Sequence, residues 1–134
     1  MYIKHFIFSA ICIGLANIFI EWFFIGFLFH KFQALTPQTW RKESGKSYAY
    51  SSLLSLLFGA LFTLFYFKIG SRYVIYGNLL SACKFGLLCF GCFVVIREIN
   101  SAIYINLDRR FTVGSLLASL FTFLAAAVIA CLFW

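Results

Sequence analysis

The chain has 134 residues, of which 63% are hydrophobic and 11% are charged, and its formal net charge is +7. Soluble domains carry about 25% charged residues, so this chain has too little polar surface to cover an apolar core in water. Its length is that of a single domain, residues 1–134. These values exclude an ordinary soluble domain and predict an integral membrane protein.

Four apolar segments predict how often the chain crosses the membrane. They cover residues 6–29, 50–67, 73–96 and 111–134. A helix of about 20 residues spans a hydrocarbon layer of about 30 Å. None of the segments alternates apolar and polar residues as a membrane β-strand does. We therefore predict an all-α fold, a polytopic membrane protein that forms a four-transmembrane-helix bundle.

The first segment has the basic, apolar beginning of a signal peptide. Its apolar stretch is too long for a cleaved signal, and no small-x-small site closes it before Glu21. We interpret it as a retained helix.

Lysines and arginines outside the spans are distributed unevenly between the two sides. One side carries seven of them, namely Lys31, Arg41, Lys42, Lys46, Arg97, Arg109 and Arg110, whereas Lys4, Lys68 and Arg72 lie on the other. The positive-inside rule places the seven-charge loops in the cytoplasm and both termini outside. We expect a bacterial inner (cytoplasmic) membrane. The net charge then reflects topology and lipid headgroups rather than nucleic-acid binding.

The first cytoplasmic loop has the pattern of a short interfacial helix. Thr36 suits its N-cap, Pro37 its first position and Gly45 its end. Trp40, Arg41 and Lys42 fit an anchor in the headgroup layer, or a docking surface for a partner.

The second cytoplasmic loop leads into the last span. Asp108 is expected to cap that helix, and Arg109 and Arg110 to hold its start at the membrane interface.

Two ionisable residues, Glu21 and Lys84, lie inside the spans. A charge in hydrocarbon is unfavourable by roughly 2.5–3.5 kcal/mol on insertion scales. Glu21 lies ten residues before Lys31 and Lys84 lies thirteen before Arg97. These offsets correspond to depths of about 15 and 20 Å. We therefore predict a buried ion pair between the first and third spans.

Small and polar residues accompany both charges at helical spacing. The set comprises Ala10, Gly14 and Asn17 in the first span, and Gly77, Ser81 and Gly91 in the third, with Ala82 and Gly86 on an adjoining strip. Small residues let helices approach closely, and Asn and Ser can bond across the contact. The charges could fix helix register, couple proton or substrate movement, or contact another subunit; Glu21 could also lie nearer the interface.

Patterns for catalysis and metal binding are weak. The CxxC of Cys89 and Cys92 lies within a span, where cysteine behaves as a small hydrophobe. His5 and His30 are about 37 Å apart in a helix and cannot ligate one metal within a monomer. We expect no enzyme activity, no cofactor and no metal.

One resemblance covers nearly the whole chain. The segment from Asn17 to Phe29, which is rich in aromatic residues, resembles the first helix of an uncharacterised bacterial family of small four-helix membrane proteins, a domain of unknown function. Trp40, the run of alanines at 125–127 and Trp134 are similar to features of that family. The resemblance implies the architecture and no activity.

The chain is also similar to small multidrug-resistance exporters in having a carboxylate, Glu21, in its first span. Lys84 and the uneven distribution of Lys and Arg depart from the pattern of those exporters. The sequence favours a non-catalytic accessory or scaffold subunit of a membrane complex or homo-oligomer. The alternative is a small transporter or channel that uses Glu21 as a coupling carboxylate. Lipid and other membrane subunits, or a second copy, are the expected partners.

Overall fold

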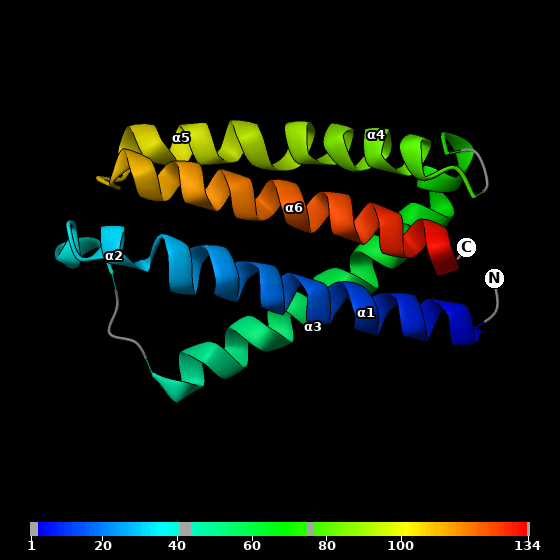
Figure 1. Cartoon of the computed structure of the whole chain (residues 1–134), viewed down its shortest axis with the longest axis horizontal. Coiled ribbons are helices and arrows are strands. Elements are labelled where there is room, and N and C mark those ends of the chain that lie inside the picture. The colour runs from blue at the N-terminus through cyan, green and yellow to red at the C-terminus, as the bar shows by residue number, and fades with distance from the viewer. Residues whose placement is uncertain (1–2, 41–43, 75–76, 134) are drawn as a thin grey trace.

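A computed structural model describes residues 3–40, 44–74 and 77–133. Four long helical rods dominate it (Figure 1). They are α1 (Ile3–Glu21) continued by the π-helix η1 (Trp22–Leu28); α3 (Gly45–Lys68); α4 (Leu79–Phe90), η4 (Gly91–Val95) and α5 (Ile96–Tyr104) in one line; and α6 (Arg109–Phe133). The short elements are α2 (His30–Gln33), η2 (Pro37–Thr39) and η3 (Gly70–Arg72).

All four rods are long and apolar enough to cross a membrane: Ile3–Leu28, Gly45–Lys68, Leu79–Tyr104 and Arg109–Phe133. The described residues contain no strand. The prediction of an all-α membrane protein with four transmembrane helices is therefore confirmed.

The rods pack in a definite order. α6 lies between α1 and α4, and α3 crosses α1 obliquely (Figure 1). α1 packs mainly against α3 and α6, whereas α4 packs mainly against α6. The start of α1 and the end of α6 lie at one end of the molecule, and the loops after η1 and α5 lie at the other.

The third rod lies later in the chain than the apolar run 73–96 predicts. Gly77 has a φ of 68°, which places it in a turn, and the Asn78 carbonyl side chain accepts the Ser81 N–H at 3.1 Å as an N-cap. The helix therefore begins at Leu79, and it continues past Arg97 to Tyr104. As a result Arg97 lies inside the rod rather than at its end.

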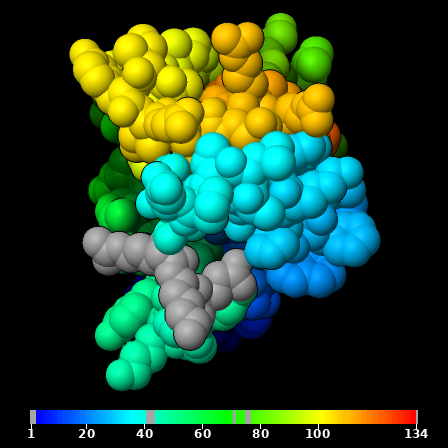
Figure 2. All heavy atoms as spheres, turned by 90° about the vertical axis from the view of Figure 1, so that its left-hand side faces the viewer, coloured from blue at the N-terminus to red at the C-terminus, as the bar shows by residue number. Residues whose placement is uncertain are grey.

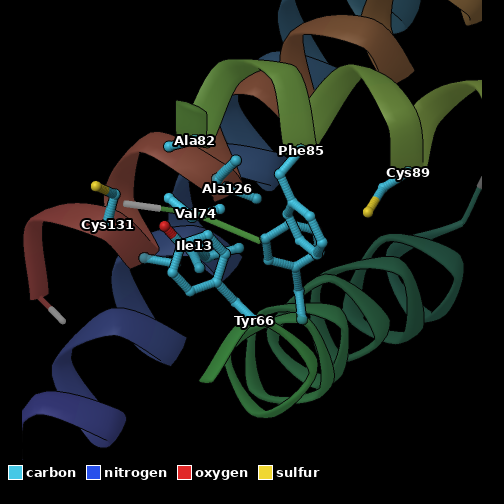
Figure 3. Packing of buried hydrophobic residues seen from close by; sticks show 11 residues of the cluster. Ile13, Tyr66, Val74, Ala82, Phe85, Cys89, Ala126 and Cys131 are labelled. Carbon is cyan, nitrogen blue, oxygen red and sulfur yellow. The ribbon is translucent and has the colours of Figure 1, made fainter. Parts of the chain in front are cut away.

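The core lies where α3, α4, α6 and α1 meet (Figure 3). Tyr66 and Ala82 are fully buried there, and Ile13 and Phe85 pack in the same cluster. Most other large apolar side chains, such as Leu88, are exposed. This outer apolar surface is the one that contacts lipid. Lipid chains are as apolar as these side chains, so exposing the side chains to them has no hydrophobic cost.

Two glycines allow the closest helix approaches. A Cβ on Gly59 of α3 would overlap the Ala10 carbonyl oxygen of α1, and a Cβ on Gly86 of α4 would lie 2.8 Å from the Phe123 carbonyl oxygen of α6. Real Cβ atoms do not come so near to backbone atoms, so larger residues at these positions would separate the helices.

Candidate functional site: a polar cleft beside α3

Asn17 connects three helices at the centre of the bundle. Its side chain is 7% exposed. The amide nitrogen donates to the Ser55 hydroxyl of α3 at 3.0 Å, and the amide oxygen accepts from the Thr122 hydroxyl of α6 at 2.9 Å. Polar bonds between membrane helices average about 0.6 kcal/mol each. Asn17 thus links α1 to both of its neighbours.

A second polar contact supports the same arrangement further toward the start of α1. The buried hydroxyls of Ser9 and Thr63 lie 3.2 Å apart, and Thr63 also donates to the Gly59 carbonyl oxygen at 2.8 Å. The α1–α3 contact therefore combines close backbone approach with two buried polar bonds.

Glu21 lies one helical turn after Asn17, and the two side chains interact. The carboxylate side chain is exposed rather than packed. It faces a cavity of about 390 Å³ that Arg97 also lines. The remaining lining is partly polar and partly apolar: Asn17, Ser51, Ser55, Ser119 and Thr122, with Leu54, Phe58, Phe93, Val94 and Phe123.

The expected pair of Glu21 and Lys84 is not formed. Glu21 lies on α1, Lys84 is exposed on α4, and these two helices are not packed together. Glu21 lies seven residues before Leu28 and Lys84 lies twenty before Tyr104, so their depths differ by about 20 Å. The expectation failed because Arg97 does not mark the end of its helix.

Arg97, rather than Lys84, lies at the same depth as Glu21. It lies seven residues before the end of α5 at Tyr104, as Glu21 lies seven residues before the end of η1 at Leu28. Both are therefore about 10 Å inside the ends of their rods. The structure thus brings Glu21 to a cavity shared with Arg97 and leaves Lys84 outside it.

A larger cavity of about 870 Å³ lies between η1 and the first half of α3. Glu21, Ser51 and Ser55 border both cavities. The first half of α3 diverges from the other rods, as Figures 1 and 2 show. Every residue from Gly45 to Leu54 is exposed except Ser52, which is half-buried. We call this segment, residues 45–54, the free half of α3.

The small residues of the third rod take different places from those expected. Gly77 lies in the turn before α4, and no atom lies within 4 Å of a Cβ built on Gly91. Ser81 is partly exposed in the first turn of α4. Ala82 and Gly86, on the adjoining strip, are the buried ones, and they face α6. The helix turns this strip inward because α4 packs on α6 rather than on α1.

Other residues of this site were missed in the sequence. Ser55, Gly59 and Thr63 of α3 lie four residues apart and share the buried face toward α1. On α6 the same spacing relates Gly114, Ala118, Thr122, Ala126 and Ala130. This spacing was the available signal, because small residues at i and i+4 mark helix contacts in membranes.

In the described part of the first loop, the helix expected from Thr36 to Gly45 is replaced by a 3-10 turn at Pro37–Thr39, after which Trp40 is extended. Gly45 begins α3 instead of ending a helix, because the Ser44 hydroxyl caps α3 by accepting the Ser47 N–H at 3.2 Å. Arg41 and Lys42 lie outside the described residues.

Trp40 packs onto the protein. Its indole N–H donates to the Thr36 hydroxyl at 3.3 Å, and its ring lies edge-on to Phe111 of α6 with centroids 4.7 Å apart. The Thr39 hydroxyl donates to the Asn106 carbonyl oxygen at 3.2 Å. The two loops are therefore joined at this end of the bundle, the end that faces the viewer in Figure 2.

The start of α6 is capped as expected. The Asp108 carboxylate accepts the Arg110 N–H at 2.9 Å. Arg109 and Arg110 are exposed, and the Arg110 guanidinium lies 5.4 Å from the centre of the Phe32 ring. Lys31 approaches the same ring at 5.2 Å. This end of the bundle presents cations close to an aromatic surface.

Groups for metal or redox chemistry do not assemble in the part of the chain that the structure describes. It contains no cluster of three or more His, Cys, Asp or Glu side chains, and its five cysteines are free thiols. Cys89 is buried and Cys92 is exposed, so the CxxC pair is divided between the core and the outer surface.

No protein-family model, curated protein or solved structure matches this chain. The resemblance to an uncharacterised four-helix family stays a prediction.

Proposed function

We propose that this integral membrane protein is a non-catalytic accessory or scaffold subunit, which works through helix–helix contact in a larger membrane complex or a homo-oligomer. The observation that carries the proposal is the free half of α3. It belongs to a membrane-spanning rod, yet its side chains are exposed on nearly every side.

The chemistry of the free half suits another helix better than lipid chains. Ser47, Ser51 and Ser52 line the cavity between this segment and η1, and Glu21 lies in the opposite wall. Small residues permit close backbone approach, and hydroxyls bond across helix contacts. A transmembrane helix with a polar stripe would fill the cavity, as α1 does for the second half of α3.

We also propose the orientation, with both termini outside and the two joined loops in the cytoplasm of a bacterial inner membrane. The support is the excess of Lys and Arg in and next to those loops; without Arg97, which lies inside its rod, six stand against three. The two loops lie at the same end of the molecule, so the positive-inside rule assigns both to one side of the membrane.

The test is co-purification. The tagged protein is extracted from its own membrane with a mild detergent and weighed by native mass spectrometry. A stoichiometric partner or a defined oligomer is expected. Ser52→Trp, which fills the cavity, should abolish the association, whereas Leu53→Trp, one residue away and 63% exposed, should preserve it. If the unaltered protein is detected only as a monomer without a partner, the proposal is contradicted.

A second candidate is a small transporter or channel that uses Glu21 as its coupling carboxylate. The observation that favours it is the position of Glu21 between two cavities that both border the free half of α3. Reconstitution of the protein alone, with flux compared between the unaltered chain and Glu21→Gln, separates the two. Flux that depends on Glu21 would refute the accessory role.

A further inference from the structure

The smaller cavity beside Glu21 holds two opposite charges that do not pair with each other. Glu21 and Arg97 both line it, and both side chains are exposed. Among the described residues no ion pair joins them. Within a membrane-spanning rod an uncompensated charge is unfavourable, so each of these groups favours a ligand of opposite charge.

The two charges lie at the same level of the bundle. Each is seven residues from the end of its rod, Leu28 for Glu21 and Tyr104 for Arg97, which is about 10 Å. A rod of 26 residues is about 39 Å long, so it extends beyond both faces of a hydrocarbon layer of about 30 Å. The two charges therefore lie at the edge of the hydrocarbon layer, next to the headgroup region.

The rest of the cavity has a polar side and an apolar side. Asn17, Ser119 and Thr122 contribute hydrogen-bonding groups, and Phe58, Phe93 and Phe123 contribute aromatic rings. The volume of about 390 Å³ is at the lower end of the range for small-ligand sites. A molecule that fits must therefore be compact, polar at one end and apolar at the other.

The charges narrow the class of ligand further. Arg97 repels a simple cation and Glu21 repels a simple anion. A zwitterion satisfies both, with an ammonium at the carboxylate and anionic oxygens at the guanidinium, which holds such oxygens with paired N–H groups. Two sources carry this chemistry, a free zwitterion and a lipid headgroup, and the aromatic wall favours the lipid.

We propose that the cavity between Glu21 and Arg97 binds the headgroup of a zwitterionic aminophospholipid, with its ammonium at Glu21 and its phosphate at Arg97. The glycerol and the first part of the acyl chains lie against the aromatic wall. The site does not depend on the partner proposed for the free half of α3, since it is formed by α1, α3, α5, η4 and α6 of one chain.

The test is lipid binding to the delipidated full chain in detergent, measured by native mass spectrometry. Phosphatidylethanolamine and phosphatidylglycerol with identical acyl chains are the probes. We expect phosphatidylethanolamine to bind at least about tenfold more tightly, since one hydrogen bond to a charged group is worth at least that factor. Equal affinities would overturn the proposal.

Substitutions test what Glu21 and Arg97 each contribute to lipid binding. Glu21→Gln should remove the preference for phosphatidylethanolamine, because the repulsion of an anionic headgroup disappears with the carboxylate. Arg97→Gln should weaken both lipids about tenfold. Lys84→Gln is the matched control: it removes a charge from a span outside the cavity and should change neither affinity. A preference lost equally in Lys84→Gln and Glu21→Gln would refute the site.

Two further arms address folding and the source of the ligand. Glu21→Asp keeps the charge and should keep the preference, which separates loss of charge from loss of structure. Glycerophosphoethanolamine carries the same ammonium and phosphodiester charges without acyl chains and should displace the lipid only at far higher concentration. Displacement at equal concentration would contradict the lipid as the occupant.

Discussion

Replacement of Gly59 by alanine is expected to destabilise the bundle where α1 crosses α3. The added Cβ would overlap the Ala10 carbonyl oxygen and would lie 2.7 Å from the Gly14 nitrogen. Both are backbone atoms, so no side chain can rotate away. The helices must therefore move apart, and the buried bonds of Ser9 and Asn17 across the same contact would lengthen.

The magnitude follows from two opposing terms. An inserted methyl group in a well-packed contact typically destabilises by about 1–3 kcal/mol. Replacement of glycine by alanine within a helix stabilises by about 0.8–1.0 kcal/mol. The free energy of unfolding of Gly59→Ala should therefore fall by about 0–2 kcal/mol, toward the upper end because the added Cβ meets backbone atoms.

The assay is unfolding of the purified protein in mixed micelles by a denaturing detergent, followed by circular dichroism. Gly91→Ala is the matched control, because no atom lies within 4 Å of the Cβ it adds. That variant should be unchanged or slightly more stable. If the two variants unfold alike, the close α1–α3 crossing is refuted.

Three further predictions use the same unfolding assay or limited proteolysis. Asn17→Leu should lower stability by about 1 kcal/mol, because two interhelical bonds are lost, and an unchanged midpoint would argue against this linkage. Lys84→Leu should change stability by less than about 0.5 kcal/mol in either direction, since the side chain is exposed and pairs with no described carboxylate; a large loss would instead restore the idea of a buried ion pair. Trp40→Ala should lower stability by about 1 kcal/mol and speed cleavage of the first loop, because its ring contact with Phe111 is removed, and an unaltered cleavage rate would count against that contact.

The four spans were predictable because span length and apolar composition are properties of each segment alone. The residues at which the helices begin and end were harder to predict. Gly45 has the residue type of a helix end, yet it begins α3, since Ser44 supplies a cap one residue earlier. Arg97 has the charge of a loop residue, yet α5 continues past it to Tyr104, and its side chain borders the partly polar cavity that Glu21 also lines.

The partners of each helix were not predictable from composition. Small residues occur in all four rods, so they do not identify which pair is in contact. Glu21 and Lys84 have opposite charges, but that complementarity says nothing about depth until the ends of both helices are known. Gly59 shows what would have helped: its spacing from Ser55 and Thr63 already marks the buried face of α3.

The central claim is that Glu21 shares its cavity with Arg97 rather than meeting Lys84. Thiol cross-linking in membranes tests it most directly, with the five native cysteines replaced by alanine. A short bismaleimide should join the pair Glu21→Cys and Arg97→Cys within one chain and should leave the pair Glu21→Cys and Lys84→Cys unlinked. Efficient linkage of the second pair, with none of the first, would contradict the account.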